Sequence, residues 1–141
     1  MDRARKVTEQ FRKQDIPEFS AGDTLKVHSI IKETDAKGVE KQRIQIFQGV
    51  CVKRRNAGIA STFTIRKISD GIGVERIYPM HSPMISKIEI ANKGAVRRAN
   101  ISYFRKLTGK AARIKRDEGV KLEEISSSSE QAQEQVNESK E

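Results

Sequence analysis

Residues 62–79 have the sequence TFTIRKISDGIGVERIYP, the clearest structural signal in the chain. Residues 62–68 alternate, with β-branched residues on both faces, and Val74, Arg76 and Tyr78 alternate with Glu75 and Ile77, which is the two-residue period of a β-strand. Asp70 and Gly71 lie between the two runs and form a strong short-range signal for a hairpin turn. Pro79 ends the second run because proline cannot donate a ladder hydrogen bond. The stretch therefore predicts a β-hairpin.

The same alternation continues on both sides of this hairpin, at intervals of about ten residues. Further strands are predicted over residues 23–30, 39–52 and 85–90, with turns at 34–38, 56–58, 82–83 and 92–94. Gly49 interrupts the long run 39–52 without changing the phase of its apolar residues, which indicates a bend within one strand. Short strands joined by short turns predict a mainly β protein, built as a small antiparallel barrel or sandwich.

The two ends of the chain have different patterns. Residues 1–14 contain no Gly or Pro and place Ala4, Val7 and Phe11 on one face of a basic N-terminal helix. Residues 15–118 carry the β domain and a basic C-terminal extension, in which 109–116 (GKAARIKR) predict a short helix. Residues 119–141 are rich in Ser and Glu, and their low hydrophobicity predicts a disordered acidic tail.

Charge is distributed unevenly along the chain. Residues 1–116 hold 26 of the 28 Lys and Arg residues but only 11 carboxylates, a net charge of +15, whereas the last 25 residues carry −6. The cations gather in clusters at the ends of apolar runs, at 53–55, 66–67, 97–98, 105–106 and 110–116. A body of this charge is typical of proteins that bind a polyanion, and nucleic acid is the commonest candidate.

Several other classes of protein are disfavoured by the sequence. The single cysteine, Cys51, excludes an intrachain disulfide, and its apolar neighbours favour a buried thiol. No apolar run approaches the length of a membrane span, and no signal peptide is recognisable at the N-terminus, so a cytoplasmic protein is expected. His28 and His81 lack companions at metal-ligand spacing, and no phosphate-binding or nucleophile motif occurs. No catalytic residue, metal or cofactor is therefore expected.

The chemistry favours RNA as the partner. Arginines outnumber aromatic residues near the predicted turns, which suits contact with phosphates and recognition of shape more than stacking on an aromatic platform. A helix-turn-helix would need helices where the periodicity predicts strands. Structured RNA is therefore favoured over single strands or operator DNA.

Seven ordered segments also resemble a known family, the bacterial large-subunit ribosomal protein nineteen family. The segments are 48–50 (QGV), 53–58 (KRRNAG), 61–68 (STFTIRKI), 71–76 (GIGVER), 81–83 (HSP), 94–99 (GAVRRA) and 108–115 (TGKAARIK). The resemblance covers about residues 1–118. Residues 101–104 (ISYF) match a more tyrosine-rich run of that family only approximately, and the tail is longer than the family usually has.

This resemblance implies an SH3-like β-barrel and a structural role in the ribosome. The partners it implies are large-subunit rRNA, small-subunit rRNA at an inter-subunit bridge, and the neighbouring large-subunit ribosomal protein fourteen. It also implies a set of RNA contacts, with His81 as the weakest candidate: Arg54, Arg55, Arg66, Lys67, Arg76, His81, Arg97, Arg98, Lys110, Arg113 and Lys115. Two alternatives remain open at this point, a free RNA-binding regulator or assembly factor and an RNA-modifying enzyme.

Overall fold

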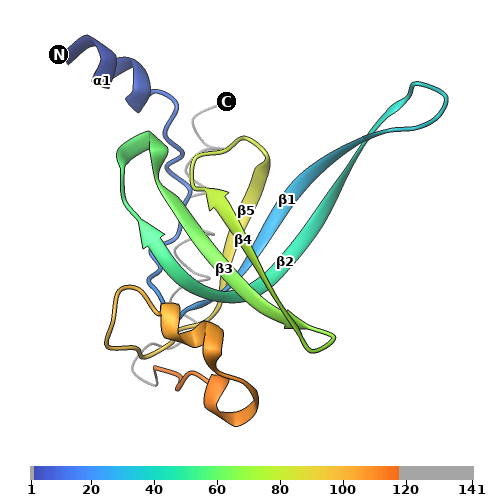
Figure 1. Ribbon diagram of the computed structural model, residues 1–141. Helices are drawn as coiled ribbons and strands as arrows, with labels where there is room; N and C mark the ends of the chain where they lie inside the picture. The colour runs from blue at the N-terminus through green and yellow to red at the C-terminus, as the bar shows by residue number, and fades with distance from the viewer. Residues whose placement is uncertain (1, 118–141) are drawn as a thin grey trace, which may run out of the picture.

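The computed structural model describes residues 2–117. Among these residues the chain forms one α-helix, five strands and three short 3₁₀ turns (Figure 1). In chain order they are α1 (Asp2–Glu9), β1 (Thr24–Thr34), β2 (Glu40–Arg55), η1 (Gly58–Ala60), β3 (Thr62–Ser69), β4 (Ile72–Pro79), β5 (Ile85–Asn92), η2 (Ser102–Lys106) and η3 (Gly109–Ala112).

The five strands form one antiparallel sheet in the order β4-β3-β2-β1-β5. β1 and β2 pair from Thr24 opposite Val50 to Thr34 opposite Glu40, and the tip of this long hairpin projects away from the rest of the molecule (Figure 1). The strands predicted by alternation and the turn at 34–38 are confirmed. The mainly β class is therefore confirmed as well.

The turn between β3 and β4 has the geometry that its sequence predicted. Asp70 and Gly71 have φ values of 52° and 78°. Both central residues of a type I′ hairpin turn need positive φ, a conformation that glycine adopts without steric cost. Because Ser69 pairs directly with Ile72, the loop has only these two residues.

β2 bends without breaking, as the spacing around Gly49 predicted. A Cβ atom at Gly49 would lie only 2.5 Å from the carbonyl oxygen of Arg66 on β3, so glycine permits a close approach of the two backbones. The register with β3 then shifts between Cys51 and Lys53, which marks a bulge. β2 curves strongly through this region in Figure 1, and the curvature lets both of its faces be covered.

Two hydrophobic clusters lie on opposite faces of β2. Cys51 faces the larger cluster, which includes Leu25, Phe47 and Phe63, and burial raises the pKa of its thiol to about 12. Val52 faces a smaller cluster with Ile101 and Phe104, supplied by the segment that follows β5. Fully burying an Ile or Val side chain stabilises a fold by about 1.5 to 3 kcal/mol. The continuous apolar run 49–52 thus reflects burial on two faces.

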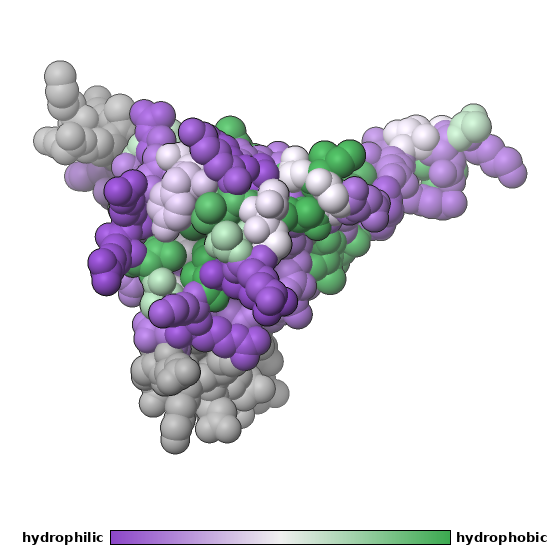
Figure 2. Space-filling view, turned by 60° about the horizontal axis from the view of Figure 1, so that its bottom comes forward, coloured by the Kyte–Doolittle hydropathy of each residue, from purple (hydrophilic) through white to green (hydrophobic). Residues whose placement is uncertain are grey.

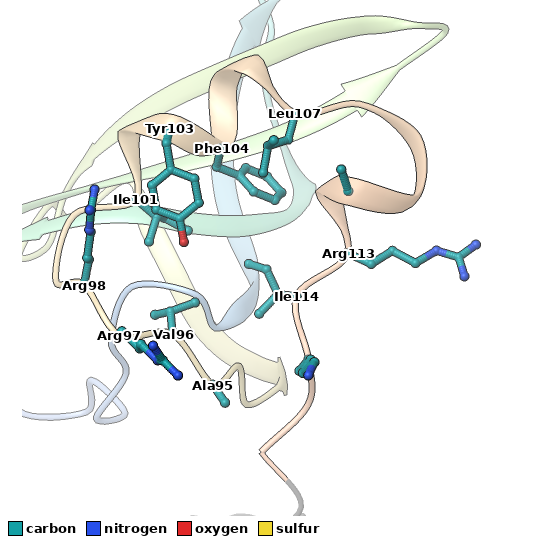
Figure 3. Close-up of a pocket in the computed structure, with 12 residues that line it drawn as sticks. Ala95, Val96, Arg97, Arg98, Ile101, Tyr103, Phe104, Leu107, Arg113 and Ile114 are labelled. Carbon is teal, nitrogen blue, oxygen red and sulfur yellow. The ribbon is translucent and has the colours of Figure 1, made fainter.

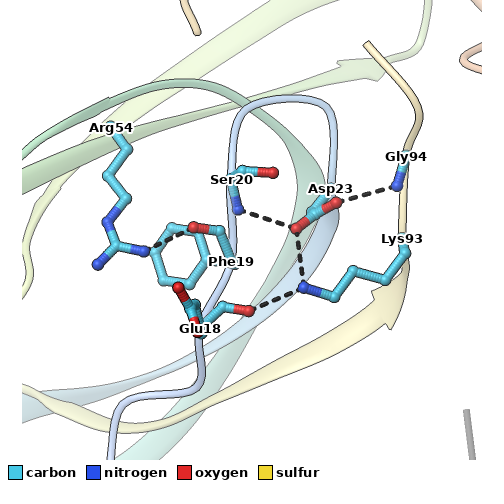
Figure 4. A network of polar contacts seen from close by, with 7 residues as sticks. All are labelled: Glu18, Phe19, Ser20, Asp23, Arg54, Lys93 and Gly94. Carbon is cyan, nitrogen blue, oxygen red and sulfur yellow. Dashed lines mark hydrogen bonds and ion pairs between the residues drawn. The ribbon is translucent and has the colours of Figure 1, made fainter. Parts of the chain in front are cut away.

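The Asp23 carboxylate links the residues just before β1 to Lys93 and Gly94, which follow β5 (Figure 4). Its side chain is 1% exposed, and its carboxylate accepts hydrogen bonds from the Ser20 and Gly94 backbone N–H groups, both at 2.9 Å. The Lys93 ammonium lies 3.4 Å from the same carboxylate and also donates to the Glu18 carbonyl at 2.8 Å. This network fixes the start of β1 against the beginning of the C-terminal segment.

Two expectations about architecture need correction. The closed barrel is not confirmed, because β4 and β5 are the edges of the sheet and no pairing among residues 2–117 joins them. The helix expected at 109–116 is wrong: only η3 forms, and the chain beyond it is extended. The Ala95 N–H donates to the Lys115 carbonyl at 3.0 Å, and the Asp117 N–H donates to the Lys93 carbonyl at 3.1 Å. These bonds take the backbone groups that a helix would use internally.

The termini were predicted with mixed success. α1 lies within the predicted range 1–14 but ends at Glu9, and it stands apart from the sheet in Figure 1. The expected disordered tail at 119–141 lies outside the described residues. Within residues 2–117, no helix is long and apolar enough to cross a membrane.

Candidate nucleic-acid interface

The predicted RNA contacts fall into three groups in the structure. The first group lies on the segment after β5, the second near the end of β2, and the third on the β3–β4 hairpin. In that order, the groups are Arg97, Arg98, Lys110, Arg113 and Lys115; Arg54, Arg55 and His81; and Arg66, Lys67 and Arg76.

Four cations of the first group, all except Lys110, line a hollow of about 500 Å³ (Figure 3). Residues 95–98 form one wall, and the η2–η3 region and residues 113–115 form the other. The walls come together because Val96 and Ile114 pack against the buried Ile101 and Phe104. Figure 2 turns this end of the molecule forward and shows hydrophobic side chains between hydrophilic ones.

The cations of this hollow are not neutralised by nearby acids. Arg97, Arg98, Arg113 and Lys115 are exposed, and no ion pair within residues 2–117 engages them. No Asp or Glu of residues 2–117 lines the hollow. Arg98 lies over the Tyr103 ring at 5.8 Å from its centroid. The arrangement attracts an anion and leaves the guanidinium and ammonium hydrogens available to bind it.

A second hollow, of about 460 Å³, contains Arg54 and His81 together with Arg12 and Lys13. The Lys13 N–H donates to His81 Nδ1 at 3.2 Å, and the Lys13 ammonium donates to the Ile85 carbonyl. His81 therefore links the segment between α1 and β1 to the turn after β4. Arg12 and Lys13 both fall within the helix predicted over 1–14, but α1 ends at Glu9. No local pattern indicates that they meet Arg54 and His81, which lie far away along the chain.

Arg54 makes several contacts within the protein. Its guanidinium donates to the Phe19 carbonyl at 2.6 Å and to the Asn56 side chain at 3.0 Å, and it lies over the Phe19 ring at 4.9 Å from the centroid. Arg55, its neighbour on β2, is exposed. The alternating strand geometry thus turns one arginine inward and the other outward.

Arg66 is largely buried and makes its contacts inside the protein. Its side chain is 16% exposed, and it donates to Glu75 at 3.2 Å and to the Arg105 carbonyl at 3.3 Å. Arg105 Nε also donates to Glu75, at 2.6 Å. The hydrogen bond from Arg105, reinforced by the charges of both arginines, lowers the pKa of the Glu75 carboxyl. Arg66 therefore joins the β3–β4 hairpin to η2.

Lys67 and Arg76 lie on the opposite face of the same hairpin. Both approach the Phe47 ring, with the Lys67 ammonium 4.7 Å and the Arg76 guanidinium 5.3 Å from its centroid. They therefore border the larger hydrophobic cluster, to which Phe47 belongs. Cations consequently reach the surface on both faces of the sheet.

The acidic, histidine and cysteine side chains of the described residues do not gather at one place. No group of three or more His, Cys, Asp and Glu residues within 2–117 could hold a metal ion. The buried thiol of Cys51 has a raised pKa and hence little thiolate at neutral pH. What the geometry gathers is positive charge around two hollows, which suits the binding of a polyanion.

Comparison with known proteins agrees with the resemblance in the sequence. The family described as ribosomal protein L19 matches residues 2–117. The large ribosomal subunit protein bL19 of Desulfosudis oleivorans is 53% identical over 117 residues, which cover 82% of this chain and 96% of that protein. The match includes the described strands and the segment after β5. The chain therefore belongs to the ribosomal protein L19 family.

Proposed function

We propose that this protein is a structural constituent of the large ribosomal subunit and binds large-subunit rRNA without catalysing a reaction. The name of the Desulfosudis oleivorans relative supports the assignment to that subunit. The observation that carries RNA binding is the hollow rimmed by Arg97, Arg98, Arg113 and Lys115, which no carboxylate lines in the part of the chain that the structure describes. The four cations repel one another in the free protein, and the negative charge of a bound polyanion offsets this repulsion.

The individual predicted contacts take different parts in this proposal. Direct contact with phosphates falls to the exposed or half-buried cations, whereas Arg54, Arg66 and His81 position the binding surface through their internal bonds. The direct contacts are Arg55, Lys67, Arg76, Arg97, Arg98, Lys110, Arg113 and Lys115.

A location near the subunit interface extends the proposal. The resemblance implies an inter-subunit bridge to small-subunit rRNA and a neighbour in large-subunit ribosomal protein fourteen, on ribosomes in the cytoplasm. Cations on both faces of the β3–β4 hairpin support a protein held between separate RNA segments. We also retain the SH3-like barrel that the resemblance implies. Contacts other than strand pairing would have to close it, because the five strands form an open sheet.

Sedimentation of a cell lysate at high magnesium tests the ribosomal assignment. We expect the protein to be present in one copy per large subunit and to remain with assembled ribosomes. Association only with precursor particles, below one copy each, would contradict this and favour an assembly factor. Absence from ribosomal fractions would contradict both.

Purified large-subunit RNA tests the electrostatic basis of binding. If six to ten phosphates are contacted, affinity should fall by roughly 10³ to 10⁵ between 50 and 200 mM salt, a calibration taken from duplex DNA. The slope arises because each cation that neutralises a phosphate releases condensed counterions. Affinity that does not change with salt would refute it.

A further inference from the structure

The hollow beside Tyr103 has an apolar floor that phosphate binding does not explain. Ile101 and Phe104 are 0% and 7% exposed, and Val96, Leu107 and Ile114 pack around them. These five side chains line the hollow from below its cationic rim. A phosphate gains nothing from apolar carbon atoms, whereas a nucleobase presents a flat face that does. The floor therefore points to a ligand with both an anionic and an apolar part.

Tyr103 offers an aromatic face to such a ligand. The side chain is 44% exposed. Figure 3 shows Arg98 on one side of the ring and Phe104, Leu107 and Ile114 on the other, with the hydroxyl group pointing toward the centre of the hollow. The guanidinium of Arg98 occupies one face through a cation–π contact at 5.8 Å. The 44% exposure of the side chain leaves part of the ring accessible to a ligand on the side that faces the hollow.

Charge and size favour a nucleotide of an RNA chain over an acidic peptide. Among the described residues, four cations and no acid line the hollow, and its volume of about 500 Å³ lies within the roughly 300 to 1,000 Å³ typical of ligand sites. In Figure 3 Arg113 extends away from the hollow, in a direction that suits a phosphate farther along a chain. A continuous polyanion with aromatic bases fits each of these features.

We propose that this hollow accepts a single unstacked base of bound RNA. The base stacks against Tyr103 above the floor formed by Ile114 and Phe104, and the phosphates beside it are held by Arg97 and Lys115. This inference rests on the proposed RNA binding, and it identifies the kind of nucleotide that the site selects: one in a bulge or loop, whose base is free to leave the stack.

Two hairpin RNAs that differ in one base test the proposal with the full chain. One carries a single bulged 2-aminopurine, and the other carries an abasic residue at the same position, so their charge and stem are the same. Stacking of one base contributes a factor of roughly 5 to 150 in affinity by alanine-substitution data. We expect the bulged hairpin to bind more tightly by that factor and its 2-aminopurine fluorescence to be quenched.

Three variants assign the effect to the hollow. Tyr103→Ala should abolish the preference for the bulged hairpin, whereas Tyr103→Phe should retain it because the stacking ring remains. Arg113→Ala should weaken both hairpins by the same factor. Since the Tyr103 side chain is half exposed, thermal melts should show that the variants remain folded. If Tyr103→Ala unfolds, the 2-aminopurine fluorescence with the unmodified chain still tests the proposal. A lack of quenching there would overturn it.

The outcomes separate this proposal from the proposed function. Equal, salt-dependent binding of the two hairpins would overturn the base site and leave RNA binding intact. A preference that survives Tyr103→Ala would overturn the base site as well. Failure of the unmodified chain to bind either hairpin at low salt would contradict RNA binding itself.

Discussion

Replacing Asp23 should destabilise the fold more than replacing any exposed acidic residue. The carboxylate is 1% exposed and serves three donors: the Ser20 N–H, the Gly94 N–H and the Lys93 ammonium. Asp23→Ala would leave the two backbone donors without this partner, and each unsatisfied buried donor costs about 1 to 3 kcal/mol. Lys93 would retain its bond to the Glu18 carbonyl, so its loss is smaller.

The expected total for Asp23→Ala is about 3 to 5 kcal/mol, a large fraction of the roughly 5 to 15 kcal/mol that stabilises a domain. Asp23→Asn keeps one oxygen that can accept a hydrogen bond from either the Ser20 or the Gly94 N–H group. Its amide NH₂ then faces the other N–H group, and two donors cannot bond to each other. We therefore expect an intermediate loss of about 2 kcal/mol for Asn.

Urea denaturation of the full chain measures these losses. With an unchanged slope of about 1 to 3 kcal/mol per molar urea, the midpoint for Asp23→Ala should fall by more than about 1 M. Asp70→Asn serves as the exposed control, because Asn suits the same positive φ. A loss below about 1 kcal/mol for Asp23→Ala would refute the reasoning that these hydrogen bonds hold the C-terminal segment.

Three further predictions test the turn, the sorting of the arginines and the tail. Gly71→Val should lower the melting temperature because a β-branched residue is strained at φ 78°, whereas Asp70→Asn should be nearly neutral; equal shifts would disprove the turn's role. Arg66→Ala should lower the free energy of unfolding, measured in urea, by about 1 to 3 kcal/mol because the hydrogen bonds of Arg66 inside the protein are lost. Arg55→Ala should weaken RNA binding and leave the melting temperature unchanged, because Arg55 is exposed. Similar effects of the two variants would contradict their different burial. Truncation after Glu118 removes an acidic segment and should tighten binding to non-cognate RNA at low salt with ribosome incorporation unchanged; unchanged non-cognate binding in a filter assay would show that the tail does not screen the cations.

Local patterns were sufficient to predict the strands and their turns. The alternation in residues 62–79 and the Asp70-Gly71 pair depend on the chain over two to eight residues, which is the range that side-chain period and φ preference control. The single bend at Gly49 was also predictable, because the apolar phase continues across it. The net charge of the body, and with it the class of partner, depends only on composition.

The roles of individual cations could not be predicted in this way. Arg54 and Arg55 are adjacent in sequence, yet Arg54 reaches the Phe19 carbonyl and Arg55 is exposed. Arg66 lies opposite Glu75, as the register set by the two-residue turn predicts, but it also donates to the Arg105 carbonyl, 39 residues away along the chain. Long-range contacts of this kind decide which cation is used inside the protein, and the local pattern does not encode them.

Composition and side-chain period are sufficient to predict a basic, antiparallel β protein with a two-residue hairpin turn at Asp70 and Gly71. Residues 109–116 have a composition that favours a helix, and only contacts formed in the folded chain prevent one. Ile114 packs into the smaller cluster, and the Lys115 carbonyl pairs with the Ala95 N–H, so long-range bonds replace the helical ones. Helix propensity amounts to less than about 1 kcal/mol per residue, and burial of an apolar side chain exceeds it. The hollow beside Tyr103 exists because packing overrides local preference at that point.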